Sequence, residues 1–153
     1  MKPSENLSRL GIVLAPPAGP FGAYVPARRA GSLIYVAGQL PMRDGTLIAS
    51  GPVPSSCPLE QARQAARQCA VNGVAAAAGL VGGVDRLVGV VRVGAFVASD
   101  DSFTQQPQVA NAASELLLEI FGDSGRHVRA AVGVNVLPLG ASVEIEFIFE
   151  AVA

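Results

Sequence analysis

The 153-residue chain has no tryptophan, a single histidine and only 5% aromatic residues. Proteins that bind nucleic acid generally carry a stripe of basic residues with aromatic side chains between them. Here the formal net charge is −1, and no basic cluster recurs along the chain apart from the local pair Arg28 and Arg29. The composition therefore argues against nucleic acid as a general partner.

Cysteine is almost as scarce as histidine. Cys57 and Cys69 lie at or within one predicted helix, twelve positions apart, which is roughly 18 Å along a helix axis. Disulfide-bonded Cα atoms lie about 4.4–6.8 Å apart, so these two thiols cannot bridge within that helix. There is no CxxC motif, and His127 is the only imidazole, so a Cys/His metal site has no support. Reduced thiols suit a cytoplasmic setting.

Long apolar runs are also missing. Glycine, proline and arginine interrupt every apolar segment before it reaches membrane-spanning length, and residues 1–6 lack the pattern of a signal peptide. We therefore expect no membrane association. No repeat or low-complexity tract divides the chain, and its length suits one domain. The sequence predicts a polar N-terminal tail over residues 1–10 and a single domain over residues 11–153.

Charged residues make up only 15% of the chain, whereas 50% of its residues are hydrophobic. Such a chain has little polar surface with which to keep a monomer in solution. This composition hints that partner subunits cover part of an apolar face.

Turn residues and apolar periodicity predict the order of the elements. A hairpin is expected over residues 24–27 and 33–37, and a tight turn at Asp44-Gly45 leads to a short strand over 46–49. A helix rich in small residues follows Pro58 and ends at the glycines of 79–83. The small residues indicate that this helix lies close to a sheet.

The rest of the chain continues with alternating strands and helices. A valine-rich strand is predicted over 87–98 and a second helix over 107–121, before a left-handed cap at Gly122. Two C-terminal strands follow. The order β-β-β-α-β-α-β-β predicts an α+β layer in which two helices pack on one face of a mostly antiparallel sheet.

The two C-terminal strands carry the main candidate residues. In the first, Val128 and Val132 alternate with Arg129 and Ala131; in the second, Glu144 lies opposite the apolar face. A guanidinium beside small residues suits a carboxylate, because the two groups match through two parallel hydrogen bonds. The alternative interpretation is an ordinary solvated strand face with a salt bridge.

Other chemistries find less support. His127 has no GxSxG elbow beside it, and both cysteines lie among small helical residues, which is typical of buried, inert thiols. The glycines of 79–83 follow a helix instead of opening one, so they cannot cradle a phosphate with helical amides. Glu144 and Glu146 lie on one face of one strand, whereas glycosidase carboxylates flank a bond from opposite sides.

Two further residues have ordinary explanations when each is taken alone. Tyr24 follows a loop rich in proline, where a tyrosine usually packs with its hydroxyl in water. Asn111 lies in the second helix, where its side chain could bond the local backbone.

Taken together, however, several segments resemble the RidA/YjgF family of reactive-intermediate deaminases, many of which are also labelled L-PSP endoribonucleases. The matching segments run in the family's order over roughly residues 11–150: Gly22-Ala23-Tyr24, Tyr35-Val36-Ala37-Gly38-Gln39-Leu40-Pro41, Phe96-Val97-Ala98, Asn111-Ala112, Arg129-Ala130-Ala131-Val132, Leu137-Pro138 and Val143-Glu144-Ile145-Glu146. The resemblance implies a chorismate-mutase-like α+β fold and a homotrimer with its sheets inside and its helices outside.

The resemblance also implies roles for particular residues. Arg129 would hold the substrate carboxylate, and Glu144 would help to place the attacking water. Tyr24 and Asn111 fall on positions that line a cleft between subunits, and Gly38 falls on its wall. The implied reaction is that of a 2-iminobutanoate/2-iminopropanoate deaminase, a hydrolase that converts an enamine or imine, such as 2-aminoacrylate, to a 2-keto acid and ammonia. It requires no metal or organic cofactor, because positioning and charge stabilisation suffice for a reaction that already proceeds in water.

This chain departs from the resemblance at two positions of the expected substrate-binding wall. Ala37 stands where many members have serine, and Ala131 stands where many have cysteine. Both changes leave the wall more apolar, so a non-catalytic or regulatory protein that binds small carboxylates is an alternative. An endoribonuclease or translation inhibitor is a further alternative, although the acidic balance argues against RNA.

Overall fold

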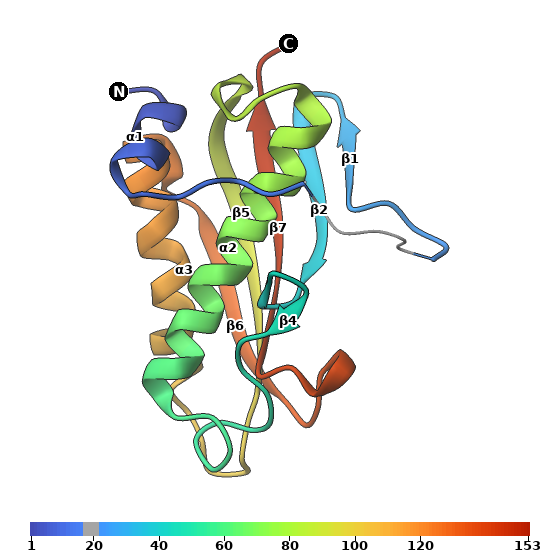
Figure 1. Ribbon diagram of the computed structural model, residues 1–153, viewed down its shortest axis with the longest axis vertical. Coiled ribbons are helices and arrows are strands. Elements are labelled where there is room, and N and C mark those ends of the chain that lie inside the picture. The colour runs from blue at the N-terminus through green and yellow to red at the C-terminus, as the bar shows by residue number, and fades with distance from the viewer. Residues whose placement is uncertain (17–21) are drawn as a thin grey trace.

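The computed structural model describes residues 1–16 and 22–153, with two long helices in front of a twisted sheet (Figure 1). The helices are α1 (Pro3–Arg9), α2 (Leu59–Val81) and α3 (Gln106–Phe121), with short 3-10 turns η1 (Val84–Arg86), η2 (Gly122–Gly125) and η3 (Pro138–Gly140). The strands are β1 (Ala27–Ala30), β2 (Leu33–Gln39), β3 (Met42–Arg43), β4 (Thr46–Leu47), β5 (Leu87–Ala98), β6 (Val128–Val134) and β7 (Val143–Ala151). The predicted α+β layer is confirmed, with three helices in the described residues instead of two.

The main sheet has five strands in the order β1-β2-β7-β5-β6, and β3 pairs with β4 in a separate two-stranded hairpin. All neighbours in the main sheet are antiparallel except β5 and β6, which are parallel, so the sheet is mixed. The connection from β5 to β6 runs through α3, which makes a β-α-β unit. The two C-terminal strands do not pair with each other, because β5 lies between them.

The first hairpin lies further along the chain than the sequence predicts. β1 covers 27–30 instead of 24–27, and Ala30 pairs with Leu33 across a turn at Gly31 and Ser32. A two-residue turn is the tightest connection between antiparallel strands, so pairing extends right up to it. Tyr24 therefore precedes the strand instead of belonging to it.

The expected polar tail needs a correction as well. Residues 3–9 form α1, in which Asn6 and Leu7 are buried. The amide of Asn6 donates to the carbonyl of Ile120 at 2.9 Å, and the hydroxyl of Ser4 donates to Asp85 at 2.6 Å. These contacts hold α1 against α3 and η1, so the N-terminal segment is part of the packed fold.

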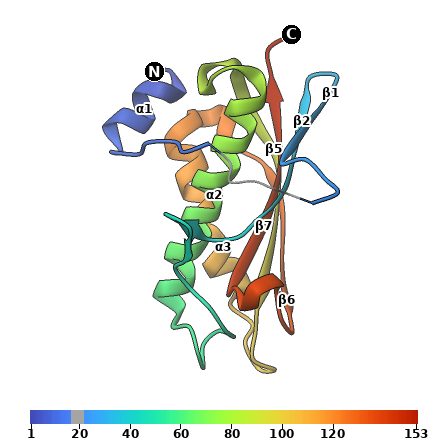
Figure 2. The same cartoon turned by 45° about the vertical axis from the view of Figure 1, so that its right-hand side comes forward.

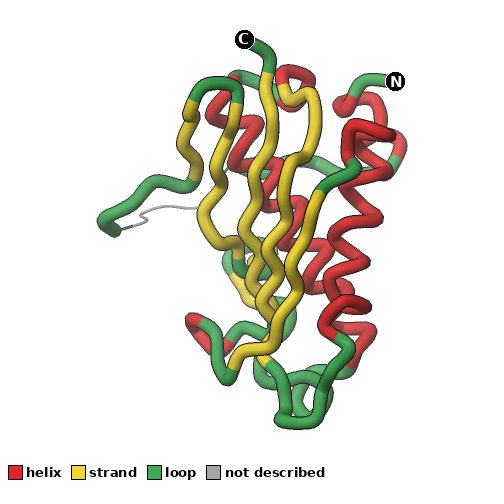
Figure 3. Tube along the Cα trace, turned by 180° about the vertical axis from the view of Figure 1, so that it is seen from behind, coloured by secondary structure: helices red, strands yellow, loops and turns green. Residues whose placement is uncertain are grey.

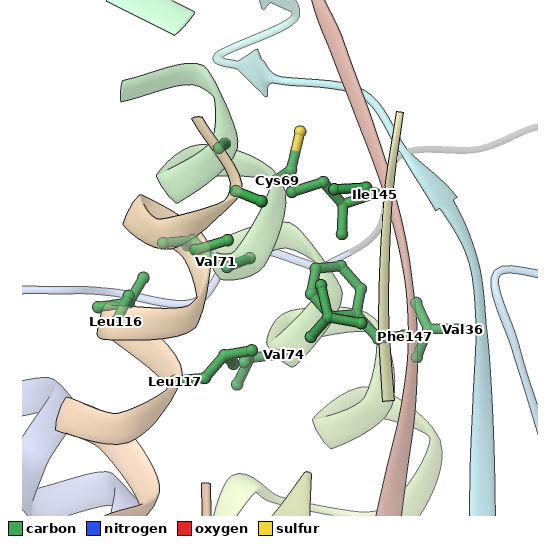
Figure 4. Close-up of a cluster of buried hydrophobic side chains, with 14 of the residues drawn as sticks. Val36, Cys69, Val71, Val74, Leu116, Leu117, Ile145 and Phe147 are labelled. Atoms are coloured by element: carbon green, nitrogen blue, oxygen red, sulfur yellow. The ribbon is translucent and has the colours of Figure 1, made fainter. Parts of the chain in front are cut away.

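Helices α2 and α3 pack side by side on one face of the sheet (Figure 2). The buried positions of α2 are mostly alanine and glycine, which lets its backbone approach the sheet closely. A Cβ atom added to Gly73 would lie 2.5 Å from the ring of Phe147 on β7. Phe147 thus fills the space between α2 and the sheet, among the apolar side chains drawn in Figure 4.

The opposite face of the sheet is not covered by any helix of the described residues (Figure 3). Exposed apolar side chains lie on this open face, with 68% of Val128 and 46% of Val132 accessible to solvent. No helix within residues 1–16 and 22–153 is both long enough and apolar enough to span a membrane.

Candidate functional site

Arg129 lies on the helix-facing side of β6. In the parallel register it pairs with Val93 of β5, which is fully buried, and Ala131 pairs with the buried Ala95. The predicted alternation along this strand is present. However, the valines of the strand point to the open face, and the arginine points inward toward α3, where it is half-buried. An ordinary solvated strand face does not describe this position.

Two side chains of α3 hold the guanidinium. Nη1 of Arg129 donates to Oδ1 of Asn111 at 2.8 Å and to Oγ of Ser114 at 3.2 Å. Asn111 and Ser114 are three residues apart, so they share one face of the helix. No carboxylate of the described residues lies within ion-pair distance of Arg129. Its positive charge is therefore oriented but not neutralised.

His127 lies next to this cluster, two residues before Arg129 on the same side of the chain. Its Nε2 is 2.8 Å from Oγ of Ser114, and its Nδ1 is 2.6 Å from the carbonyl oxygen of Gly125. Burial, with the nearby charge of Arg129 as a smaller contribution, lowers the pKa of His127 from its ordinary 6.5. The ring is therefore neutral at neutral pH.

An open pocket of about 260 Å³ adjoins these side chains. Its lining consists of Ser114, Leu118, Arg126, His127 and Arg129. Nε and Nη2 of Arg129 make no hydrogen bond to the described residues, and a guanidinium with such an edge at a pocket of this size can bind a small organic anion.

Glu144 lies on the other face of the sheet. It pairs with Phe96 of β5, in a strand whose alternate residues Val143 and Ile145 are fully buried beneath the helices. A Cβ atom added to Gly38 would lie 2.5 Å from Oε1 of Glu144, so the absence of a side chain at Gly38 lets the carboxylate lie directly against β2. The sequence resemblance places Gly38 on the wall of an expected cleft between subunits, and that assignment stays a prediction.

The ionisation of Glu144 is perturbed. Burial, and secondly the charge of Glu146, raise the pKa of Glu144 above its ordinary 4.5. Glu146 lies on the same face and forms an ion pair with Arg92 of β5 at 3.0 Å. Glu144 has no such cation beside it within the described residues.

A second pocket, of about 360 Å³, lies beside β2 and the β3–β4 hairpin. Its walls include Tyr24, Ala37 and Gly38, which were three of the expected substrate-binding residues; the others are Ala15, Pro16, Gln39, Leu40, Met42, Asp44, Gly45 and Asn72. The pairing of β2 with β7 is irregular between Val36 and Gln39, so Ala37 and Gly38 lie in a bulge. The bulge turns this part of β2 toward the pocket.

The structure thus divides the expected site residues into two groups. Arg129, Ala131 and Asn111 lie at the β6 edge of the sheet, on the helix side. The second group consists of Tyr24, Ala37, Gly38 and Glu144, which lie around β2 and the open face of β7. Strand β5 separates β6 from β7, so a single chain does not bring the arginine and the glutamate together.

Ser114 and His127 are the residues of this cluster that the sequence analysis did not select. His127 was considered as a metal ligand and as a catalytic base, and it was set aside in both roles. Two signals could have found the pair. Asn111 and Ser114 are spaced for one helical face, and His127 and Arg129 are spaced for one strand face. In a β-α-β unit those two faces meet.

Comparison with known proteins agrees with this architecture. The model of the family described as "YjgF/chorismate mutase-like, putative endoribonuclease" matches residues 5–151. A Trypanosoma cruzi protein named TCP17 is 42% identical over 148 residues, which are 96% of this chain and 92% of that protein.

Two solved structures are also similar. A protein of unknown function from Agrobacterium tumefaciens is 40% identical, with a TM-score of 0.90, and the alignment covers 98% of this chain and 92% of that one. A protein from Shewanella oneidensis, described as a "putative endoribonuclease", is 28% identical, with a TM-score of 0.93, and the alignment covers 98% and 99% of the two chains.

Proposed function

Because the chain belongs to the YjgF/chorismate mutase-like family, we propose that it is a deaminase of reactive enamines and imines. It would hydrolyse 2-aminoacrylate and related 2-imino acids to 2-keto acids and ammonia. The observation that carries the proposal is the guanidinium of Arg129, which is oriented by two side chains, has no anionic partner among the described residues and lines a pocket.

Arg129 would bind the carboxylate of the substrate. Both N–H groups of its Nη1 are engaged by α3, which leaves Nε and Nη2 on the opposite edge of the guanidinium. That edge presents two parallel N–H donors, the geometry that matches a carboxylate. The contact fixes the imine carbon relative to the protein, and such positioning accelerates a reaction that already proceeds in water.

Glu144 would act on water. Water adds its oxygen to the carbon of the C=N bond while the nitrogen takes up a proton, and this step gives a carbinolamine. The C–N bond then breaks, the oxygen forms the keto C=O bond and loses its proton, and the nitrogen leaves as ammonia. The raised pKa of Glu144 makes its carboxylate a stronger proton acceptor than an exposed glutamate, so it suits the transfer of these protons.

Two copies of the chain would complete the site, in a homotrimer. Arg129 at the β6 edge and Glu144 on the open face belong to different groups of residues in one chain. An apolar open face that carries Val128 and Val132 is suited to association with another copy. The cleft would then contain Arg129 and Asn111 of one copy, with Tyr24, Gly38 and Glu144 of the next.

The test is the release of ammonia and keto acid from 2-aminoacrylate, which a serine dehydratase generates during the assay. We expect the protein to accelerate this release in proportion to its concentration. Arg129→Ala removes a bidentate contact of roughly 1.5–3 kcal/mol, so its kcat/KM should fall by about ten-fold or more. Arg129→Lys is the matched control, because lysine keeps the positive charge but lacks the two parallel N–H donors. Its kcat/KM should lie between those of the unaltered protein and of Arg129→Ala. An unaccelerated reaction at every protein concentration would rule out the proposal.

The more apolar wall favours one alternative. Ala37 lines the second pocket and Ala131 packs beside Arg129 on β6, and neither side chain can donate a hydrogen bond to a substrate. Saturable binding of 2-oxobutanoate without any turnover of 2-aminoacrylate would identify a carboxylate-binding protein instead of an enzyme. The endoribonuclease name carried by the family is tested separately, by incubating the purified protein with RNA. The protein should leave the RNA intact, because a net charge of −1 offers little phosphate neutralisation.

A further inference from the structure

The donor and the acceptor of each hydrogen bond around His127 follow from which atoms can carry a proton. The carbonyl of Gly125 can only accept, so Nδ1 of His127 must carry a proton. In a neutral ring Nε2 is then an acceptor, so the hydroxyl of Ser114 donates to it. Nη1 of Arg129 can only donate, so Oγ of Ser114 accepts from it. The chain of donors therefore runs from Arg129 through Ser114 and His127 to the backbone of Gly125.

The surroundings keep the imidazole in this state. His127 is half-buried between α3 and the start of β6, and Arg129 lies on its own strand. The charged groups on the elements packed around it are Arg126, Asp123 on η2, Glu115 and Glu119 on α3, and Arg92 on β5. Most of these charges are paired elsewhere, in the ion pairs Arg126–Asp123, Arg63–Glu115 and Arg92–Glu146. Burial and the charge of Arg129 thus favour the neutral ring.

The backbone fixes the position of the imidazole. A Cβ atom added to Gly125 would lie 2.6 Å from the carbonyl oxygen of Leu117, so only glycine lets this segment lie directly on α3. That close approach brings His127 within hydrogen-bond distance of Ser114, one turn before Leu117 along the helix. The imidazole is therefore anchored at both of its nitrogens.

We propose that Ser114 and His127 are positioning residues for Arg129: His127 holds Ser114, and Ser114 and Asn111 occupy Nη1, so that Nε and Nη2 remain available to a carboxylate in the adjoining pocket. The inference rests on the proposed function for the identity of the ligand, a small 2-keto or 2-imino acid. The hydrogen-bond chain itself is independent of that function.

The first experiment reads the hydrogen-bond chain directly. His127 is the only histidine of the protein, so ¹⁵N NMR of the imidazole in the full chain reports one ring. We expect the tautomer with the proton on Nδ1 at neutral pH. A ring protonated on Nε2 alone would overturn the proposal whether or not the protein is an enzyme.

The second experiment measures binding of 2-oxobutanoate by calorimetry. Ser114→Ala and His127→Ala should each weaken binding by roughly ten-fold. The first variant loses the acceptor for the guanidinium, and the second loses the imidazole that holds this acceptor in place. His127→Gln should recover most of the affinity, because its side-chain oxygen can accept from Ser114 as Nε2 does. Glu119→Gln, on the same helix, is the control and should bind as the unaltered protein does.

The two proposals fail in different ways. If Arg129→Ala abolishes binding while Ser114→Ala and His127→Ala bind normally, the positioning role is wrong and the proposed function survives. If the unaltered protein binds no keto acid, the proposed function fails, and with it the role in carboxylate binding. In the deaminase assay, both alanine variants should raise KM more than they lower kcat. A loss confined to kcat would contradict a role in orienting the carboxylate anchor.

Discussion

At the scale of single residues, the orientation of Arg129 depends on groups that lie outside its own strand. Asn111 accepts the shorter of the two hydrogen bonds from Nη1, at 2.8 Å. Hydrogen bonds that involve a charged group contribute about 1.5–3 kcal/mol, roughly twice as much as neutral ones. In the proposed site, the helix would therefore contribute to the affinity while the strand carries the charge.

This arrangement predicts a difference between two substitutions of Asn111. Asn111→Ala removes one acceptor, and we expect the affinity for 2-oxobutanoate to fall by about ten-fold. Asn111→Asp places a carboxylate against the guanidinium, so it competes with the ligand and should weaken binding further. Calorimetric titration of both variants measures the difference. Tighter binding by the aspartate variant would contradict a carboxylate site at Arg129.

The pair of glutamates on β7 predicts a pH effect. The folded state raises the pKa of Glu144, so its carboxylate becomes protonated at a higher pH than an exposed glutamate as the pH falls. If Glu144 is the proton acceptor, kcat/KM should decline over this same range, above pH 4.5. Glu146→Gln removes the like charge, so the pKa of Glu144 should fall and the acidic limb of the profile should move to lower pH. If the acidic limb of the profile does not move, a group other than Glu144 is responsible for it.

At the scale of elements, the contact between α2 and β7 sets how closely the helices approach the sheet. Gly73→Ala would place a methyl group 2.5 Å from the ring of Phe147. We expect this overpacking to cost about 1–3 kcal/mol of the free energy of unfolding. Gly79→Ala, in the same helix but with no atom within 4 Å of the new methyl group, is the matched control. It should stabilise the protein by up to about 1 kcal/mol, because alanine has the higher helix propensity. Urea unfolding of both variants measures the effect, and equal stabilities would contradict the close packing.

The elements also show what the sequence could predict. The strand over 87–98 and the end of α3 at Phe121 were predicted correctly, because a long run of β-branched residues and a helical apolar stripe leave little ambiguity. α1 was missed, because its seven residues are mostly polar and it is held by tertiary contacts to Ile120 and Asp85. Propensity alone does not form so short a helix.

The face of β6 that turns inward could not be deduced from periodicity. Its valines look like core residues, and its arginine looks like a surface residue. In the fold the reverse holds, because β6 is an edge strand whose inner side meets the polar face of α3 at Asn111 and Ser114. Periodicity identifies two faces of a strand, but only the neighbouring element determines which of them is buried.

At the scale of the whole molecule, the proposed site residues form two separate groups in one chain. The arginine group lies at the β6 edge, and the glutamate group lies at β2 and the open face of β7. The uncovered face between them bears apolar side chains that a monomer would leave in water. In the proposed enzyme, neighbouring copies therefore supply the two groups to each site.

The most direct measurement of this arrangement is complementation between two impaired variants, Arg129→Ala and Glu144→Gln, co-expressed with different affinity tags and purified through both. Each variant alone should have a strongly reduced deaminase activity. In mixed assemblies some sites combine an intact Arg129 from one copy with an intact Glu144 from the other, so activity with 2-aminoacrylate should return. If the mixed assemblies are isolated and are no more active than the separate variants, the two residues do not form one site between copies.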